Sequence, residues 1–200
     1  MTPVRNIDNV FAGAFGAWQV YQGVDSSQIR CSCRRLKVGG YAVLYDGSAG
    51  LRRIEIIKIK DNPSTGVWGL DRPLSYIYGA RSCRLAIVPI DTDVEVKTPG
   101  EYSFAHRMKL YRVEVAGEFD VLRFDLVRTL CLYESSVKAS DQSDRPGNRA
   151  IFMRACHGVD VCDVNIEGSK HPIMFNSCVN VLLKRVAAPT ATDRIIGHGT

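Results

Sequence analysis

Residues 151–188 contain one strand pattern twice, displaced by 22 residues. The apolar residues of the first copy and their counterparts in the second are Ile151 and Ile173, Met153 and Phe175, Cys156 and Cys178, Val159 and Val181, Val161 and Leu183, and Val164 and Val186. Most neighbours in each copy are two residues apart, which is the period of a strand. A fixed period of this length indicates a stacked architecture, in which each turn of the chain buries its apolar side against the next.

The turn before this repeat matches it with a longer displacement of 29 residues. The matching pairs are Leu122 and Ile151, Phe124 and Met153, Leu130 and Val159, Leu132 and Val161, and Val137 and Ile166. The additional residues fall in the polar stretch 140–148, which we expect to be a loop that leaves the stack intact. A further strand pattern begins at Ile195 and Ile196. Because the last edge of a stack needs a cover, we expect a partner chain there or, as we favour, more coils of a longer protein beyond residue 200.

The first part of the chain has a different pattern. A helix is predicted only around Asn9 to Gln22, where Gly13 and Gly16 weaken it. Residues 38–78 alternate in short strands separated by turn residues, which predicts a small antiparallel meander. The expected domains are residues 1–37, an N-terminal attachment segment; 38–90, the meander and entry to the coil; and 91–200, the coils.

Composition excludes several classes of protein. A hydrophobic share of 46% and a charged share of 24% are typical of a globular chain. No apolar run is long enough to span a membrane, and the N-terminus does not resemble a secretory signal. We therefore expect a chain without membrane insertion that is a cytosolic product or is exported by a route other than the general secretory one. The net charge is +5, and the densest basic stretch, residues 30–37, predicts a solvated loop or an intersubunit contact. No recognition helix or phosphate loop accompanies it, so nucleic acid is not an expected partner.

The seven cysteines do not suggest a metal or cofactor site. Cys31 and Cys33 lack the usual CxxC spacing, and the four histidines are scattered singly. We therefore expect no metal and no cofactor. Cys156 and Cys178 occupy the same position in successive turns, about 4.8 Å apart along a stack. Both a disulfide and two buried free thiols are compatible with that position.

Two runs of sequence resemble a known family. One is the run at 156–168 with its echo at 178–181, and the other is the run at 39–47 followed by 56–59 and 70–74. They resemble the pectate-lyase-like right-handed parallel β-helix family, in particular bacteriophage tailspikes and tail fibres. Gly40-Tyr41 stands here where the family commonly has Gly-Asp. The resemblance implies an all-β fold: a right-handed parallel β-helix with a small antiparallel β-meander insert and an N-terminal attachment segment.

The same resemblance implies a function in the virion. It implies a phage tail spike or fibre component, made in the host cytoplasm, that attaches to other tail or baseplate proteins and recognises a bacterial surface polysaccharide. Such spikes assemble as homotrimers. Two alternatives stay open: a polysaccharide lyase or glycoside hydrolase with catalytic coils beyond residue 200, and a purely structural baseplate or adaptor protein. The attachment residues would be the apolar side chains Phe11, Phe15, Trp18 and Tyr21, which form an exposed patch unless a partner covers them.

Cleavage of a glycan needs two carboxyl groups on either side of the glycosidic bond. The candidates are Asp125, Asp160, Asp163 and Glu167. One turn later, the last three of them meet Leu182, Arg185 and Pro189. This comparison finds no second carboxylate on the following coil. We therefore expect solvated surface acids, and a scaffold rather than an enzyme over the residues present.

Overall fold

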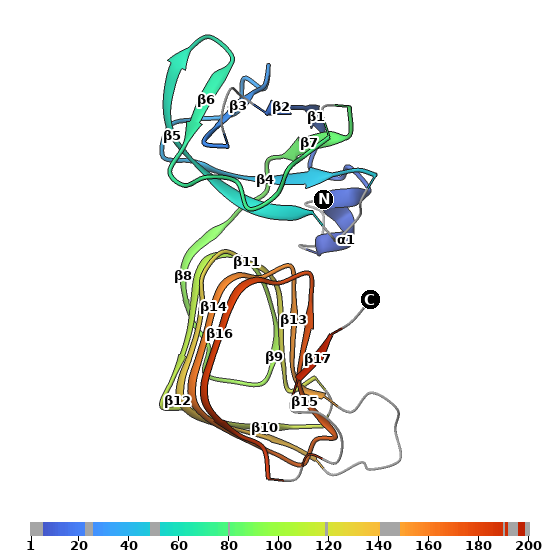
Figure 1. Cartoon of the computed structure of the whole chain (residues 1–200), viewed down its shortest axis with the longest axis vertical. Helices are drawn as coiled ribbons and strands as arrows, with labels where there is room; N and C mark the ends of the chain where they lie inside the picture. Colours follow the sequence, from blue (N-terminus) through green and yellow to red (C-terminus); the bar gives the residue numbers. More distant parts are fainter. Residues whose placement is uncertain are drawn as a thin grey trace. The chain divides into compact units, whose positions relative to one another are not determined.

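Figure 1 shows the computed structural model of the chain, which describes residues 6–22, 26–48, 53–79, 81–118, 120–140, 149–189, 191 and 196–198. The chain divides into two compact units, Met1–Ile90 and Asp91–Thr200. Each unit has its own sheet and its own hydrophobic core, and the two are described separately below. No helix among the described residues is long and apolar enough to cross a membrane.

The first unit is a seven-stranded antiparallel sheet with one short helix. Its elements are α1 (Ile7–Phe11), β1 (Trp18–Gln19), β2 (Tyr21–Gln22), β3 (Gln28–Arg30), β4 (Tyr41–Asp46), β5 (Ile54–Ser64), β6 (Val67–Leu70) and β7 (Cys83–Ala86). The strand order is β1-β7-β4-β5-β6-β3-β2. Strands β4, β5 and β6 pair in chain order, which is the meander that the pattern of residues 38–78 predicts.

The N-terminal helix is shorter than predicted. The sequence pattern predicts a helix around Asn9 to Gln22, but α1 ends at Phe11. Gly13 and Gly16 adopt φ values of 71° and 84°, a left-handed conformation that does not continue a helix. The chain then enters β1 and β2, so the prediction is wrong beyond the first helical turn.

The expected attachment residues are mostly covered within the first unit. Phe15 is only 9% exposed, whereas Tyr21 is 49% exposed. Phe11 and Trp18 are half-buried. Strand β1 pairs with β7, and β3 pairs with β6, so strands from the first 37 residues belong to the same sheet as the meander. The expected exposed patch is therefore reduced to one prominent tyrosine, and a role in attachment stays a prediction.

One carboxylate of the first unit is buried. This residue, Glu55, is 1% exposed. It accepts hydrogen bonds from the Ser75 N–H, at 3.1 and 3.2 Å to its two oxygens, and from the Tyr78 hydroxyl at 3.0 Å. Burial raises the pKa of Glu55, and these hydrogen bonds offset only part of that rise.

The stability of the first unit is therefore expected to fall as the pH rises. A carboxyl with a higher pKa in the folded than in the unfolded protein binds more protons when folded, so the free energy of unfolding decreases between the two pKa values. Glu55→Gln should remove this contribution, which is at most about 1.4 kcal/mol per pH unit. Urea unfolding between about pH 4 and pH 7 measures it, followed by the fluorescence of Trp18 and Trp68, the two tryptophans of the chain. Parallel stability curves for the two proteins would contradict the prediction.

The second unit is built from one ten-stranded sheet in which all described pairings are parallel. Its strands are β8 (Asp91–Glu95), β9 (Gly100–Tyr111), β10 (Glu114–Gly117), β11 (Leu122–Val127), β12 (Leu130–Ala139), β13 (Arg149–Arg154), β14 (His157–Glu167), β15 (His171–Asn176), β16 (Val179–Ala187) and β17 (Ile196–His198). Figure 1 shows how the strands of successive turns follow one another around a common interior. The expectation of an all-β fold with a parallel stack is confirmed.

The register of this sheet confirms the repeat. Ile151 lies opposite Ile173 and Val159 opposite Val181, at the displacement of 22 residues. Leu122 lies opposite Ile151, at the displacement of 29. The register extends one turn further towards the N-terminus than the sequence pattern indicated, because Gly100 lies opposite Leu122. Most of the loop expected at 140–148 lies outside the described residues.

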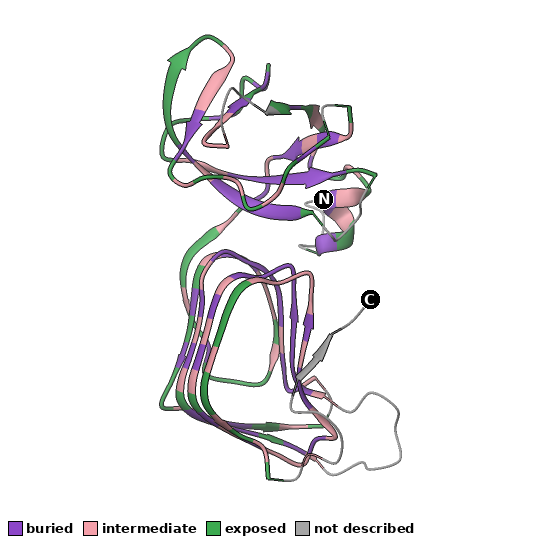
Figure 2. Ribbon diagram, in the orientation of Figure 1, coloured by how far each residue is buried: buried purple, intermediate pink, exposed green. Residues whose placement is uncertain are grey.

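The inward side chains of these strands form one continuous core. Figure 2 shows the alternation of buried and more exposed residues along the strands. One column of the core is aromatic or sulfur-containing over four turns: Tyr102, Phe124, Met153 and Phe175. The rings of the first two are stacked, with centroids 5.9 Å apart. Burial of the apolar side chains in such columns makes the main contribution to the stability of the stacked turns.

Two columns of residues with a left-handed backbone conformation mark the corners where the strands change direction. One column is Phe104, Leu126, Ala155 and Ser177, and the other is Arg112, Glu134, Asp163 and Arg185. Their φ values lie between 47° and 56°. The spacing along the chain is 22, 29 and 22 residues in both columns. None of these residues is Gly or Asn, the types that normally reveal such a conformation in a sequence.

All seven cysteines are free thiols. Cys156 and Cys178 are neighbours on successive turns, as the repeat predicts, and the Val179 N–H donates to the Cys156 carbonyl at 2.9 Å. The Cys156 thiol is fully buried, and its one hydrogen can be donated to the carbonyl oxygen of Phe124 at 3.5 Å or of Arg154 at 3.6 Å. Burial raises its pKa well above the ordinary value, so the thiol serves as a small apolar core residue.

Candidate functional site

The outward side chains of five neighbouring strands of the second unit line up in rows. Strands β8, β9, β12, β14 and β16 pair in this order. The register places Glu95, Lys109, Cys131, Asp160 and Leu182 in one row, and Tyr111, Tyr133, Cys162 and Lys184 in the next. We call the outer surface formed by these two rows the Tyr111 face. It combines one exposed and one half-buried tyrosine ring, Tyr111 and Tyr133, with charged groups of both signs.

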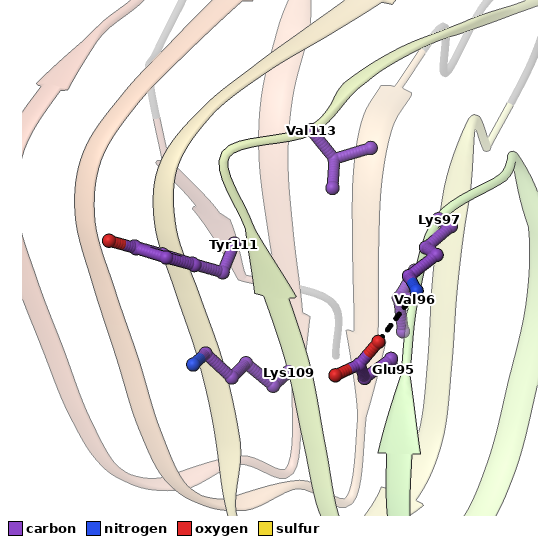
Figure 3. A pocket seen from close by; sticks show the side chains of 6 residues that line it. All are labelled: Glu95, Val96, Lys97, Lys109, Tyr111 and Val113. Carbon is purple, nitrogen blue, oxygen red and sulfur yellow. Dashed lines mark ion pairs between the residues drawn. The ribbon is translucent and has the colours of Figure 1, made fainter.

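A groove of about 230 Å³ lies at the N-terminal end of the Tyr111 face. Figure 3 shows the residues that line it: Glu95, Val96, Lys97, Lys109, Tyr111 and Val113. Val96 is buried, and Val113 packs against the core of the unit. The groove therefore has an apolar base and charged walls, a combination that suits a polar ligand with apolar ring faces.

Tyr111 is the aromatic residue that lines the groove, and it is 39% exposed. The Lys109 Nζ lies 4.5 Å from the centroid of its ring, and the Arg112 Cζ lies 4.7 Å from it. Both distances are within the range of cation–π attraction. The Lys109 and Tyr111 side chains extend from β9 in the same direction (Figure 3). The ring thus holds two cations in defined positions at the surface.

Some charged residues in and beside the groove form ion pairs and others do not. Lys97 Nζ lies 2.7 Å from a Glu95 oxygen, and this contact lowers the pKa of Glu95. The guanidinium of Arg112 donates to Glu134 at 2.6 Å. Lys109 forms no ion pair with any residue that the structure describes. It contributes less than Lys97 to the lowered pKa of Glu95, so of the two lysines in the groove it is the one without a close ion pair.

At one corner of the stack, four charged residues follow one another on consecutive turns. They are the left-handed residues Arg112, Glu134, Asp163 and Arg185, so the charges run positive, negative, negative, positive. Arg112 binds Glu134, and Arg185 binds the two oxygens of Asp163 through its Nε and one Nη. Arg185 lowers the pKa of Asp163 to about 2. Each carboxylate thus has its own arginine.

This corner corrects the sequence comparison of carboxylates. Asp163 does have a carboxylate neighbour, because Glu134 occupies the equivalent position on the preceding turn. The sequence analysis compares each carboxylate only with the following turn. Counting 29 residues back from Asp163 leads to Glu134 on the preceding turn. Glycosidic cleavage requires one carboxyl that stays protonated, with a raised pKa. Asp163, whose pKa is lowered, cannot be that protonated carboxyl, and Glu134 is ion-paired with Arg112 at 2.6 Å, so the two carboxylates fit ion pairing better than acid catalysis.

The other candidates are separated from one another. Asp160 lies on the Tyr111 face, is half-buried, and accepts a hydrogen bond from the Tyr133 hydroxyl at 2.5 Å. This bond raises the pKa of Tyr133. Glu167 lies at the end of β14 and accepts from the Asn165 amide at 3.0 Å. Tyr133 and Tyr111, which the sequence analysis did not single out, are adjacent across β9 and β12. Their positions one turn apart are the signal that could have identified them.

Asp125 is not the solvated acid that we expected. It lies on β11, outside the Tyr111 face, and is 8% exposed. The Arg154 guanidinium binds it with two hydrogen bonds of 3.0 and 2.7 Å, and Arg123 approaches it at 3.3 Å. Beside it, the outward ring of Phe152 contacts the guanidinium groups of Arg123 and Arg149, 5.4 and 4.3 Å from its centroid. These residues form a buried ionic cluster on the outside of the sheet, which has a structural role.

Metal-binding geometry is not found in the described part of the chain, where no three His, Cys, Asp or Glu side chains lie close enough to hold an ion. Cys31 and Cys33 are buried in the first unit. The Cys33 N–H donates to the Cys31 sulfur at 3.4 Å. Burial raises the pKa of Cys31, which disfavours the thiolate that a metal would need.

Comparison with known proteins gives a structural likeness only. No protein-family model and no curated protein matches the sequence. Among solved structures, the chain is similar to the tailspike protein gp49 from Pseudomonas phage LKA1, with a TM-score of 0.47 and 13% sequence identity. The match covers 80% of this chain and 33% of that one, so the chain spans about a third of the length of that tailspike.

Proposed function

We propose that this chain is a component of a phage tail spike or tail fibre and that its Tyr111 face recognises a host-surface polysaccharide. In this proposal residues 91–200 form a right-handed parallel β-helix, residues 38–90 the meander and entry to the coil, and residues 1–37 an attachment segment. The chain assembles as a homotrimer in the virion and contacts other tail or baseplate proteins. The residue patterns that resemble tailspikes support the assignment.

The observation that carries the proposal is the alignment of outward aromatic and charged side chains on consecutive turns. The core fixes the register of β9 and β12, so Tyr111 and Tyr133 are held side by side without any loop between them. Aromatic rings on rigid strands bind sugar rings with little loss of conformational freedom. A linear polysaccharide has repeating units, and a surface with aligned positions offers it several contacts along one direction.

Binding to bacterial glycans tests the proposal. The 200-residue protein should bind lipopolysaccharide or capsular polysaccharide from at least one strain of a bacterial panel, as measured by biolayer interferometry. Tyr111→Ala should weaken that binding about fivefold or more. The matched control is Tyr21→Ala, which removes a tyrosine of comparable exposure from the first unit. Equal weakening by both substitutions would contradict the site, and no binding to any strain would contradict the function.

A second measurement on the same samples separates binding from cleavage. Reducing ends should not accumulate when the protein is incubated with a glycan that it binds. Release of oligosaccharides would overturn the scaffold proposal in favour of a glycan-cleaving protein. Glu134→Gln and Asp163→Asn would then identify whether the adjacent carboxylates are responsible.

A further inference from the structure

We propose that the groove at Tyr111 is selective for an anionic sugar, whose carboxylate or phosphate group binds the Lys109 ammonium. The inference rests on the proposed glycan-binding function and specifies the chemistry of the ligand. It follows from the arrangement of one aromatic ring and four charged groups at the N-terminal end of the Tyr111 face.

Lys109 is held in position before any ligand arrives. Its backbone lies in the middle of the sheet, where β9 pairs with both β8 and β12. Its ammonium lies 4.5 Å from the centre of the Tyr111 ring. This contact restricts a side chain that is otherwise among the most flexible in proteins. A positioned ammonium binds an anion with a smaller entropy cost than a freely moving one.

The neighbouring charges leave Lys109 available. Glu95 lies opposite Lys109 in the register, yet its carboxylate contacts Lys97 at 2.7 Å. Arg112 approaches the same ring but is bound to Glu134. A neutral sugar would leave the Lys109 charge without an ion pair in the groove. An anionic group would pair with it, next to a ring that can contact the rest of the sugar.

Glu95 provides a second, opposite test of the same idea. Its carboxylate lies in the wall of the groove and would repel an anionic ligand. Removing the Glu95 charge should therefore strengthen binding, whereas removing the Lys109 charge should weaken it. A purely structural role for these exposed residues would not produce changes of opposite sign.

The experiment compares three defined glycans by isothermal titration calorimetry. They are alginate oligosaccharides, which carry carboxylates; phosphomannan, which carries phosphates; and dextran, which is neutral. The wild-type protein should bind at least one of the two anionic glycans, and bind it more tightly than dextran. For that glycan, Lys109→Gln should lower the affinity about tenfold, Lys109→Arg should retain it, and Glu95→Gln should raise it about twofold to threefold. The anionic glycan that binds identifies the preferred group.

The matched control is Lys58→Gln. Lys58 also lies over a tyrosine ring, 5.7 Å from the centroid of Tyr41, but in the first unit. This variant should bind the anionic glycan as the wild type does. Dextran binding as tight as that of the anionic glycans, unchanged in Lys109→Gln, would overturn the inference and leave the proposed function intact. Absence of binding to all three glycans and to every bacterial preparation would overturn both.

Discussion

Replacement of Arg154 by methionine is expected to destabilise the second unit by about 3 kcal/mol, because it breaks a buried ion pair. The substitution keeps much of the apolar volume of the side chain but removes both hydrogen bonds to the buried Asp125 carboxylate. Among the residues that the structure describes, Arg123 is then the remaining ion-pair partner of that carboxylate, at 3.3 Å. Removing one partner of a buried ion pair is costly because the other charge stays away from water.

Two comparisons make this prediction specific. The double variant Asp125→Leu, Arg154→Met removes both charges and should recover most of the lost stability. Arg107→Met removes an exposed ion pair with Asp93, in which both side chains are more than half exposed, and should cost about 1 kcal/mol or less. Urea unfolding followed by far-ultraviolet circular dichroism measures all three. A loss below about 1 kcal/mol for Arg154→Met alone would contradict the role assigned to the cluster.

Phe124→Ala is expected to destabilise the second unit by about 3 to 5 kcal/mol. Phe124 is fully buried and lies in the core column between Tyr102 and Met153. The alanine variant loses the contact with the Tyr102 ring and leaves a cavity between two turns. Parallel pairing on both sides restrains β11, so the neighbouring turns cannot collapse into the space.

Phe124→Met is the matched control for this core position. The next turn already has a methionine, Met153, at the equivalent place in the column. The substitution should therefore cost less than about 1.5 kcal/mol. Urea unfolding measures both variants, and amide hydrogen exchange of β11 and β13 reports the local effect. Equal losses for methionine and alanine would show that ring stacking, and not volume, determines the stability of the column.

The stack could be predicted from the sequence because its inward positions are chemically uniform. Val159, Val161 and Val164 recur as Val181, Leu183 and Val186, and the structure pairs each with its counterpart. Apolar side chains at fixed spacing report directly on the register. The first described turn, around Gly100, was not recognised because Gly100 is small and Tyr102 is half-buried, so its match to Leu122 and Phe124 is weak in sequence.

The candidate site was much less predictable, since outward residues do not repeat. Asp125 was expected at the surface, but Arg154 on the next turn binds and buries it. The displacement of 29 residues relates those two positions, yet a pairing of opposite charges does not register as a repeat. The corner residues with a left-handed backbone give no sign of that conformation in the sequence either. Asp163 and Arg185 are left-handed through the geometry of the stack and not through a local preference.

Buried and exposed residues alternate along the strands that form the Tyr111 face, and this affects how that surface can change in evolution. Lys109 and Tyr111 alternate with Met108 and Leu110, which are buried in the core. A substitution at an outward position leaves the packing of its neighbours untouched, so ligand preference can drift without loss of folding. The proposed recognition surface can therefore change one side chain at a time while the core of the stack stays the same.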